Sequence, residues 1–225
     1  MAAHQEKTGL IKESLNELLH IAGHSINYRK IDHNIWGKNA NGGVLAFPSA
    51  IILFSIIDCL GSVFIRDENI DIIIDGKNRK IKTTSQHIYI LNSKYFNLEL
   101  SQFDLNNIYI NFRCTLTHNS LMPEGYYILS NDRNRIPFEI GITEEFDNRI
   151  YFLNLNSLYH VTKKAVELFI SDLDCGVIKF EATELNKTID QRSKRARPHP
   201  IPNQPGQSHI PMKKWIKKTE IKQNE

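Results

Sequence analysis

The stretch VLAFPSAIILFSII, residues 44–57, is the part of this sequence that most restricts the fold. It is apolar on nearly every side of a helix, so a helix formed here needs other elements to cover it. Asp58 closes the run, which is shorter than the roughly 20 apolar residues that cross a membrane. Pro48 suits the first turn of a helix, where its missing N–H costs nothing. We therefore expect a central, buried helix in a soluble protein without a membrane span.

Three more segments space their apolar residues by three and four, as amphipathic helices do. They cover about residues 6–26, 101–118 and 158–173. Ser101 is placed to cap the second helix, and Asn156 or Ser157 the third, because a side-chain oxygen can accept a free N–H there. The third helix should bury one face, made of Leu158, Val161, Ala165, Leu168, Phe169 and Leu173. Shorter helices are expected within residues 85–96 and from Phe180 to about Asp190.

Two regions between these helices have β character. Residues 70–84 contain two β-rich runs on either side of Asp75, Gly76, Lys77 and Asn78, which is the composition of a tight hairpin turn. Residues 126–155 predict two or three short strands, with turns at residues 130–134 and 144–148. The expected fold class is mostly α (α+β), a helical domain with short β insertions.

Charge is distributed unevenly along the chain. The net charge is +3, but residues 191–225 hold nine Lys or Arg and two Glu, a net +7, so residues 1–190 sum to 3 − 7 = −4. Five of the eight prolines also lie after residue 190, and few apolar residues do, so we expect a domain at 1–190 and a disordered tail at 191–225. In the tail, a cluster of four lysines around a tryptophan either grips nucleic-acid phosphates while the indole stacks on a base, or only keeps the tail solvated. The cluster is Lys213, Lys214, Trp215, Lys217 and Lys218.

The cysteines indicate the compartment. Cys59, Cys114 and Cys175 are odd in number, far apart and without CxxC spacing, which favours neither a disulfide framework nor a zinc site. The N-terminus lacks the charged start and apolar core of a secretory signal. We expect a cytoplasmic protein that needs no metal and no cofactor.

Arg113 and His118, five residues apart in RCTLTH, are the residues with the clearest chemistry. A guanidinium presents donors that match phosphate oxygens, and an imidazole can pass protons near neutral pH. Together they suffice to cleave RNA through its own 2′-hydroxyl, with His118 as general acid or base and Arg113 stabilising the phosphorane. The alternative is a polar pair that only satisfies the carbonyls at a helix end.

Arg-x4-His near the end of an internal helix of a mostly helical domain resembles the Arg-x4-6-His motif of the HEPN superfamily. The resemblance implies a metal-independent RNase, often a toxin or an antiphage factor, whose site forms where two protomers meet. It therefore implies RNA as substrate, a homodimer, and an antitoxin or another regulatory partner. Members commonly have a polar residue, often Asn, directly after the arginine, and this chain has Cys114. On a regular helix, residues five apart point about 140° apart, so either the helix frays or ends between them, or a partner copy brings each Arg113 toward the other chain's His118.

Three further residues near the pair are candidates for support: Asp58, Cys114 and Asn119. Asp58 either orients a group of the site or, as we favour, bonds nearby backbone. Cys59 and Cys114 are expected to be small buried hydrophobic residues. Four other histidines share no spacing and are expected at the surface or its boundary: His24, His33, His87 and His160.

Three other functions stay open. The first is a non-catalytic HEPN-like module that binds RNA or a protein partner. The second is a structural dimer whose ligand is another copy of itself. The third is a protein whose side chains are nucleotidylated by a neighbouring transferase.

Overall fold

The computed structural model describes residues 2–119, 121–130, 136–142, 149–180 and 183–196. The chain divides into two compact units, residues 1–188 and residues 189–225. The structure is mostly helical with two small sheets, which confirms the expected fold class. The first unit contains the candidate site.

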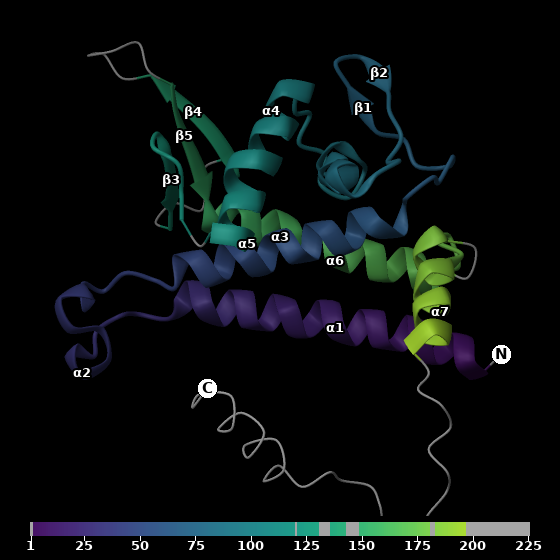
Figure 1. Cartoon of the computed structure of the whole chain (residues 1–225), viewed down its shortest axis with the longest axis horizontal. Helices are drawn as coiled ribbons and strands as arrows, with labels where there is room; N and C mark the ends of the chain where they lie inside the picture. The colour runs from purple at the N-terminus through teal and green to yellow at the C-terminus, as the bar shows by residue number, and fades with distance from the viewer. Residues whose placement is uncertain (1, 120, 131–135, 143–148, 181–182, 197–225) are drawn as a thin grey trace, which may run out of the picture. The chain divides into compact units, whose positions relative to one another are not determined.

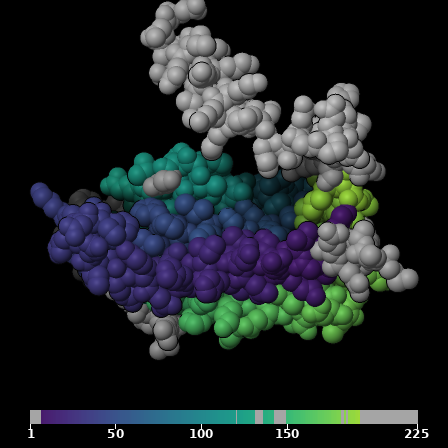
Figure 2. Space-filling view, turned by 90° about the horizontal axis from the view of Figure 1, so that it is seen from below, coloured from purple at the N-terminus to yellow at the C-terminus, as the bar shows by residue number. Residues whose placement is uncertain are grey.

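Three long helices form the body of the first unit (Figure 1): α1 (Ala2–Asn27), α3 (Ala46–Val63) and α6 (Leu155–Asp174). The apolar α3 lies at the centre and contacts α1, α6 and the 3-10 helix η2 (Thr84–Asn92). Its side chains Leu53, Ile56 and Leu60 are fully buried. Figure 2 is seen from the side of α1, which lies across the view with α3 above it and α6 below it. The expected central helix is confirmed.

Among the described helices, α3 alone has the length and composition of a membrane span, and half of it is buried within the fold. The core helix of a globular fold has the same properties, so the length and composition of α3 are weak evidence for a membrane span. Before α3 the chain forms two short helical pieces, α2 (His33–Trp36) and η1 (Gly37–Asn39).

The two sheets are small. The expected hairpin is present as β1 (Ile73–Ile74) and β2 (Lys77–Asn78), whose turn places Asp75 and Gly76 at φ of 50° and 70°. Glycine adopts such left-handed backbone without a Cβ clash. The second sheet has the order β3 (Tyr126–Leu129), β5 (Arg149–Asn154), β4 (Phe138–Ile142), with β3 parallel and β4 antiparallel to β5.

A continuous helical run carries Arg113 and His118 toward α3. It begins as α4 (Gln102–Asn107), widens into the π-helix η3 (Ile108–Cys114) and ends as α5 (Thr115–Asn119). Ser101 caps it as expected: its hydroxyl accepts the Asp104 N–H at 3.1 Å, and the Asp104 carboxylate accepts the Ser101 N–H at 3.2 Å. Phe112, 2% exposed, packs its ring against Tyr126 of β3 and Phe138 of β4. This contact fixes the run against the second sheet.

Several sequence expectations need correction. Helix α6 begins at Leu155 with Asn154 as its N-cap, not at Asn156 or Ser157, because strand β5 continues to Asn154 and leads directly into the helix. Leu168, expected in the core, is 40% exposed.

The helix expected at about 180–190 is α7 (Glu184–Ala196), which continues past the predicted start of the tail. The turns at 130–134 and 144–148 lie almost wholly outside the described residues. So do residues 197–225, with the tail cluster Lys213, Lys214, Trp215, Lys217 and Lys218.

Candidate functional site

The guanidinium of Arg113 is held by Asp58. Its Nε donates to Asp58 Oδ2 at 2.8 Å, and Nη2 lies 2.6 Å from the same oxygen. Both side chains are 18% exposed, so the pair is mostly removed from water while one edge remains accessible. Burial alone would lower the pKa of Arg113, but the hydrogen bond and the charge of Asp58 raise it overall. Arg113 is therefore a fixed cation whose charge is partly balanced.

Arg113 lies in the π-helix η3, whose polar side chains are hydrogen-bonded to their neighbours. Hydrogen bonds link the side chains of Asn107, Asn111 and Tyr126. Asn111 Nδ2 donates to Tyr126 Oη at 2.9 Å, and Tyr126 Oη donates to Asn107 Oδ1 at 2.7 Å. The hydroxyl of Thr115 donates a hydrogen bond to the carbonyl oxygen of Asn111, and a local bond of this kind competes with regular helix geometry. π-helical turns are rare and often occur at functional sites.

Two neighbours complete the surroundings of Arg113. Cys114 Sγ lies 3.9 Å from Arg113 Nη1, and the ring of Tyr109 lies 5.6 Å from the Arg113 guanidinium carbon. Burial, followed by the nearby Cys114, raises the pKa of Tyr109, so this phenol is neutral at pH 7. Cys114 is half-buried, as is Cys59 one residue after Asp58.

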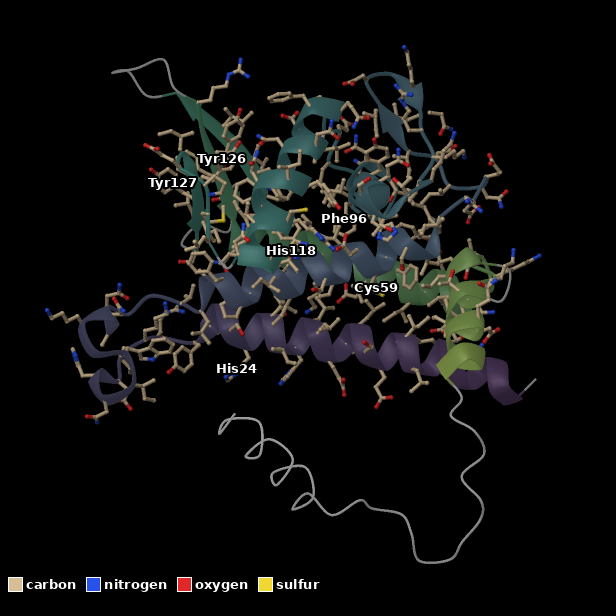
Figure 3. All side chains as sticks on the ribbon, viewed as in Figure 1. His24, Cys59, Phe96, His118, Tyr126 and Tyr127 are labelled. Atoms are coloured by element: carbon tan, nitrogen blue, oxygen red, sulfur yellow. The ribbon has the colours of Figure 1, made fainter. Side chains whose placement is uncertain are left out.

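His118 lies one turn beyond Arg113 and is exposed (Figure 3). Among the residues that the structure describes, its imidazole has no hydrogen-bond or ion-pair partner. The π-helix ends at Cys114, so the step from Arg113 to His118 follows an ordinary α-helix and separates their directions. Arg113 turns to α3 and His118 turns to solvent. Within one chain the two are not brought onto a common point.

Of the three supporting candidates, Asp58 and Cys114 contact Arg113, and Asn119 lies beside His118. Asp58 does contact a site residue, and the backbone bond that we favoured for it is not present among the described residues. Its side chain reaches Arg113 because α5, which directly continues η3, contacts α3 at this point. Cys114 contacts Arg113, whereas Asn119 is exposed beside His118.

One residue of this site was wrongly placed by sequence reasoning. His87, expected at the surface or its boundary, is only 7% exposed. Burial lowers its pKa, the charge of Asp58 opposes this shift, and the charge of Arg113 adds to it. The apolar run directly after it, IYIL at residues 88–91, was a signal that this part of the helix packs into the core. His24, His33 and His160 are exposed, as expected.

Two hollows lie away from the exposed edge of Arg113. The larger, about 640 Å³, lies at the end of α3 and is lined by residues that include Phe64, Arg66, Lys94, Tyr95 and Ile178. The smaller, about 310 Å³, lies between η3 and the sheet, with Phe112 and Phe138 in its wall. Neither Arg113 nor His118 lines either hollow. Within the described part of the chain, no group of three or more His, Cys, Asp or Glu side chains is placed to hold a metal ion.

No family model, no curated protein and no solved structure matches this chain. The assignment of a function therefore depends on the residues around Arg113 themselves.

Proposed function

We propose that the chain is a metal-independent RNase, and that Arg113 and His118 act on one phosphodiester where two copies of the chain meet. The observation that supports this most is the Arg113–Asp58 pair. Asp58 holds the Nε and Nη2 edge of the guanidinium and Nη1 lies 3.9 Å from Cys114 Sγ, so the guanidinium keeps a fixed orientation while 18% of the side chain stays exposed. A donor fixed before the substrate arrives stabilises developing charge better than a flexible one.

The chemistry follows from the two side-chain types. A neutral imidazole of His118 takes the proton of the RNA 2′-hydroxyl, whose oxygen then attacks phosphorus. The bond from phosphorus to the 5′ oxygen breaks, and a protonated imidazole delivers a proton to that oxygen. The products are a 2′,3′-cyclic phosphate and a 5′-hydroxyl, and Arg113 stabilises the charge on the phosphorane between them.

A second copy explains how both groups reach one phosphate. Arg113 and His118 face different directions in one chain, and a two-fold axis beside α5 would put each arginine near the other copy's imidazole. Two copies also supply two imidazoles, one to remove a proton and one to return it. The biological setting that we propose, a toxin or antiphage factor under a regulator in the cytoplasm, comes from the HEPN resemblance alone.

The test compares substitutions at the site with matched controls. We expect Arg113→Ala and His118→Ala each to abolish cleavage of a structured RNA and any growth inhibition in a bacterial host, while the dimer persists. Arg149→Ala and His160→Ala remove an exposed arginine and an exposed histidine from elsewhere and should leave cleavage unchanged. EDTA should have no effect. Equal cleavage by the site variants and the controls would remove the catalytic assignment.

A specific observation favours a second candidate, a non-catalytic module that binds RNA or a protein. The carboxylate of Asp58 already balances the charge of Arg113, and Cys114 stands where family members commonly have a polar residue. A binder would retain labelled RNA in a gel-shift assay and leave it whole. An enzyme would leave cyclic phosphate ends.

A further inference from the structure

His87 lies inside the fold next to the Arg113 site. Its side chain is buried, and its Nε2 has no hydrogen-bond partner among the described residues. The second carboxylate oxygen of Asp58, Oδ1, is also buried and has no such partner within the described chain. Buried polar atoms without partners are rare in proteins and call for an explanation.

Gly61 shows how tightly η2 is pressed on α3 at this point. A Cβ at Gly61 would lie 2.4 Å from the carbonyl oxygen of His87 and 2.8 Å from its Cα, so only glycine fits there. Asp58 precedes Gly61 by three residues and therefore shares this face of α3. The backbone of His87 on η2 therefore lies against the face of α3 that carries Asp58, and Arg113 reaches Asp58 from η3.

We propose that His87 is a positioning residue and a proton-operated control of the site: neutral, it leaves Asp58 to hold Arg113, and protonated, it competes for that carboxylate and releases Arg113. The release is a property of the folded chain alone. That it governs RNA cleavage rests on the function proposed above.

The surrounding charges agree with a neutral His87 at pH 7. Burial and Arg113 both lower its pKa, and Asp58 only partly opposes them. Cys59, the other titratable group of α3 nearby, has a thiol whose pKa is raised by burial and then by Asp58, so it adds no charge. Burial and the nearby Cys114 raise the pKa of Tyr109, beside Arg113, so its phenol is also neutral.

The effect on stability has a definite sign. An unfolded histidine titrates at about 6.5 and folded His87 titrates lower, so below about 6.5 the unfolded chain binds more protons. The contribution of His87 to stability is complete above about pH 6.5 and is lost as the pH falls toward its folded pKa.

The experiment is an NMR titration of the full chain without RNA. We expect His87 to titrate below the ordinary histidine value of about 6.5. The Arg113 Nε–H signal should be protected from exchange at pH 7 and should lose protection with the midpoint of His87. This comparison uses only the natural chain. A His87 that titrates at or above about 6.5, or an Arg113 signal whose protection does not follow the titration of His87, would overturn the proposal.

Two variants test the coupling through Asp58. Asp58→Asn should lower the pKa of His87 further, because a favourable charge is lost, and Arg113→Gln should raise it, because a repulsive one is lost. An unchanged His87 pKa in both folded variants would also overturn the proposal. Since no step uses RNA, failure of the RNase assignment would leave these results standing, and the two failures are distinguishable.

Discussion

The Arg113–Asp58 pair makes a quantitative prediction about stability. Removing one partner of a buried ion pair typically costs about 3 to 5 kcal/mol, because the other charge stays buried without compensation. Both side chains here keep 18% exposure, which places the expected cost of Asp58→Ala at the lower end, about 3 kcal/mol. Removing Arg113 as well takes away the charge that was left unpaired. The double variant should therefore be about 2 kcal/mol more stable than the Asp58→Ala variant.

The assay is equilibrium unfolding in urea of the natural chain, the two single variants and the double variant. With a slope of about 3 kcal/mol per molar, Asp58→Ala should lower the midpoint by about 1 M. Lys163 and Glu167 are the control pair: they are 4.0 Å apart with exposures of 52% and 62%, so each alanine there should cost less than about 0.5 kcal/mol. If Asp58→Ala and Arg113→Ala cost no more than these controls and add without coupling, the reasoning about a preorganised guanidinium is refuted.

Two further substitutions test the packing that places the site. Gly61→Ala should lower the free energy of unfolding by about 3 kcal/mol, since its Cβ meets backbone of His87 that cannot turn aside, and the melting temperature should fall by about 10 °C. Gly9→Ala is the control: apart from the backbone of its own helix, no atom of the described chain lies within 4 Å of the added Cβ, so this variant should be neutral or stabilising. Equal melting temperatures of the two variants would contradict the packing. Phe112→Ala should cost about 3 to 5 kcal/mol, because the ring joins η3 to the sheet; circular dichroism melts measure this, and a loss below about 1 kcal/mol would contradict it.

Much of the fold could be predicted from the order of apolar residues. The uninterrupted apolar run identified α3 as the central helix, and Asp75 with Gly76 identified the hairpin turn, because few residues tolerate positive φ. The π-helix could not be predicted, since spacings of three and four suit both an α-helix and a short widened turn. The start of α6 was missed because Asn154 ends a strand and caps a helix at once.

The site was predictable only in part. RCTLTH identified Arg113 and His118 by their chemistry, but no periodicity shows that Arg113 turns inward to Asp58, 55 residues earlier in the chain. That contact depends on how η3 lies on α3, which is tertiary packing. His87 was misjudged for the same reason, since only the close approach at Gly61 brings η2 against this face.

The most direct measurement of the central claim is cleavage of two RNAs that differ in a single atom. One is all ribose, and the other lacks the 2′-hydroxyl at the cleaved position. The account predicts that the purified chain, in EDTA, cuts the first to a 2′,3′-cyclic phosphate, detected by mass spectrometry, and leaves the second whole at that position. Equal cutting of both RNAs, or no cutting of either, would contradict the assignment of Arg113 and His118 to phosphodiester chemistry.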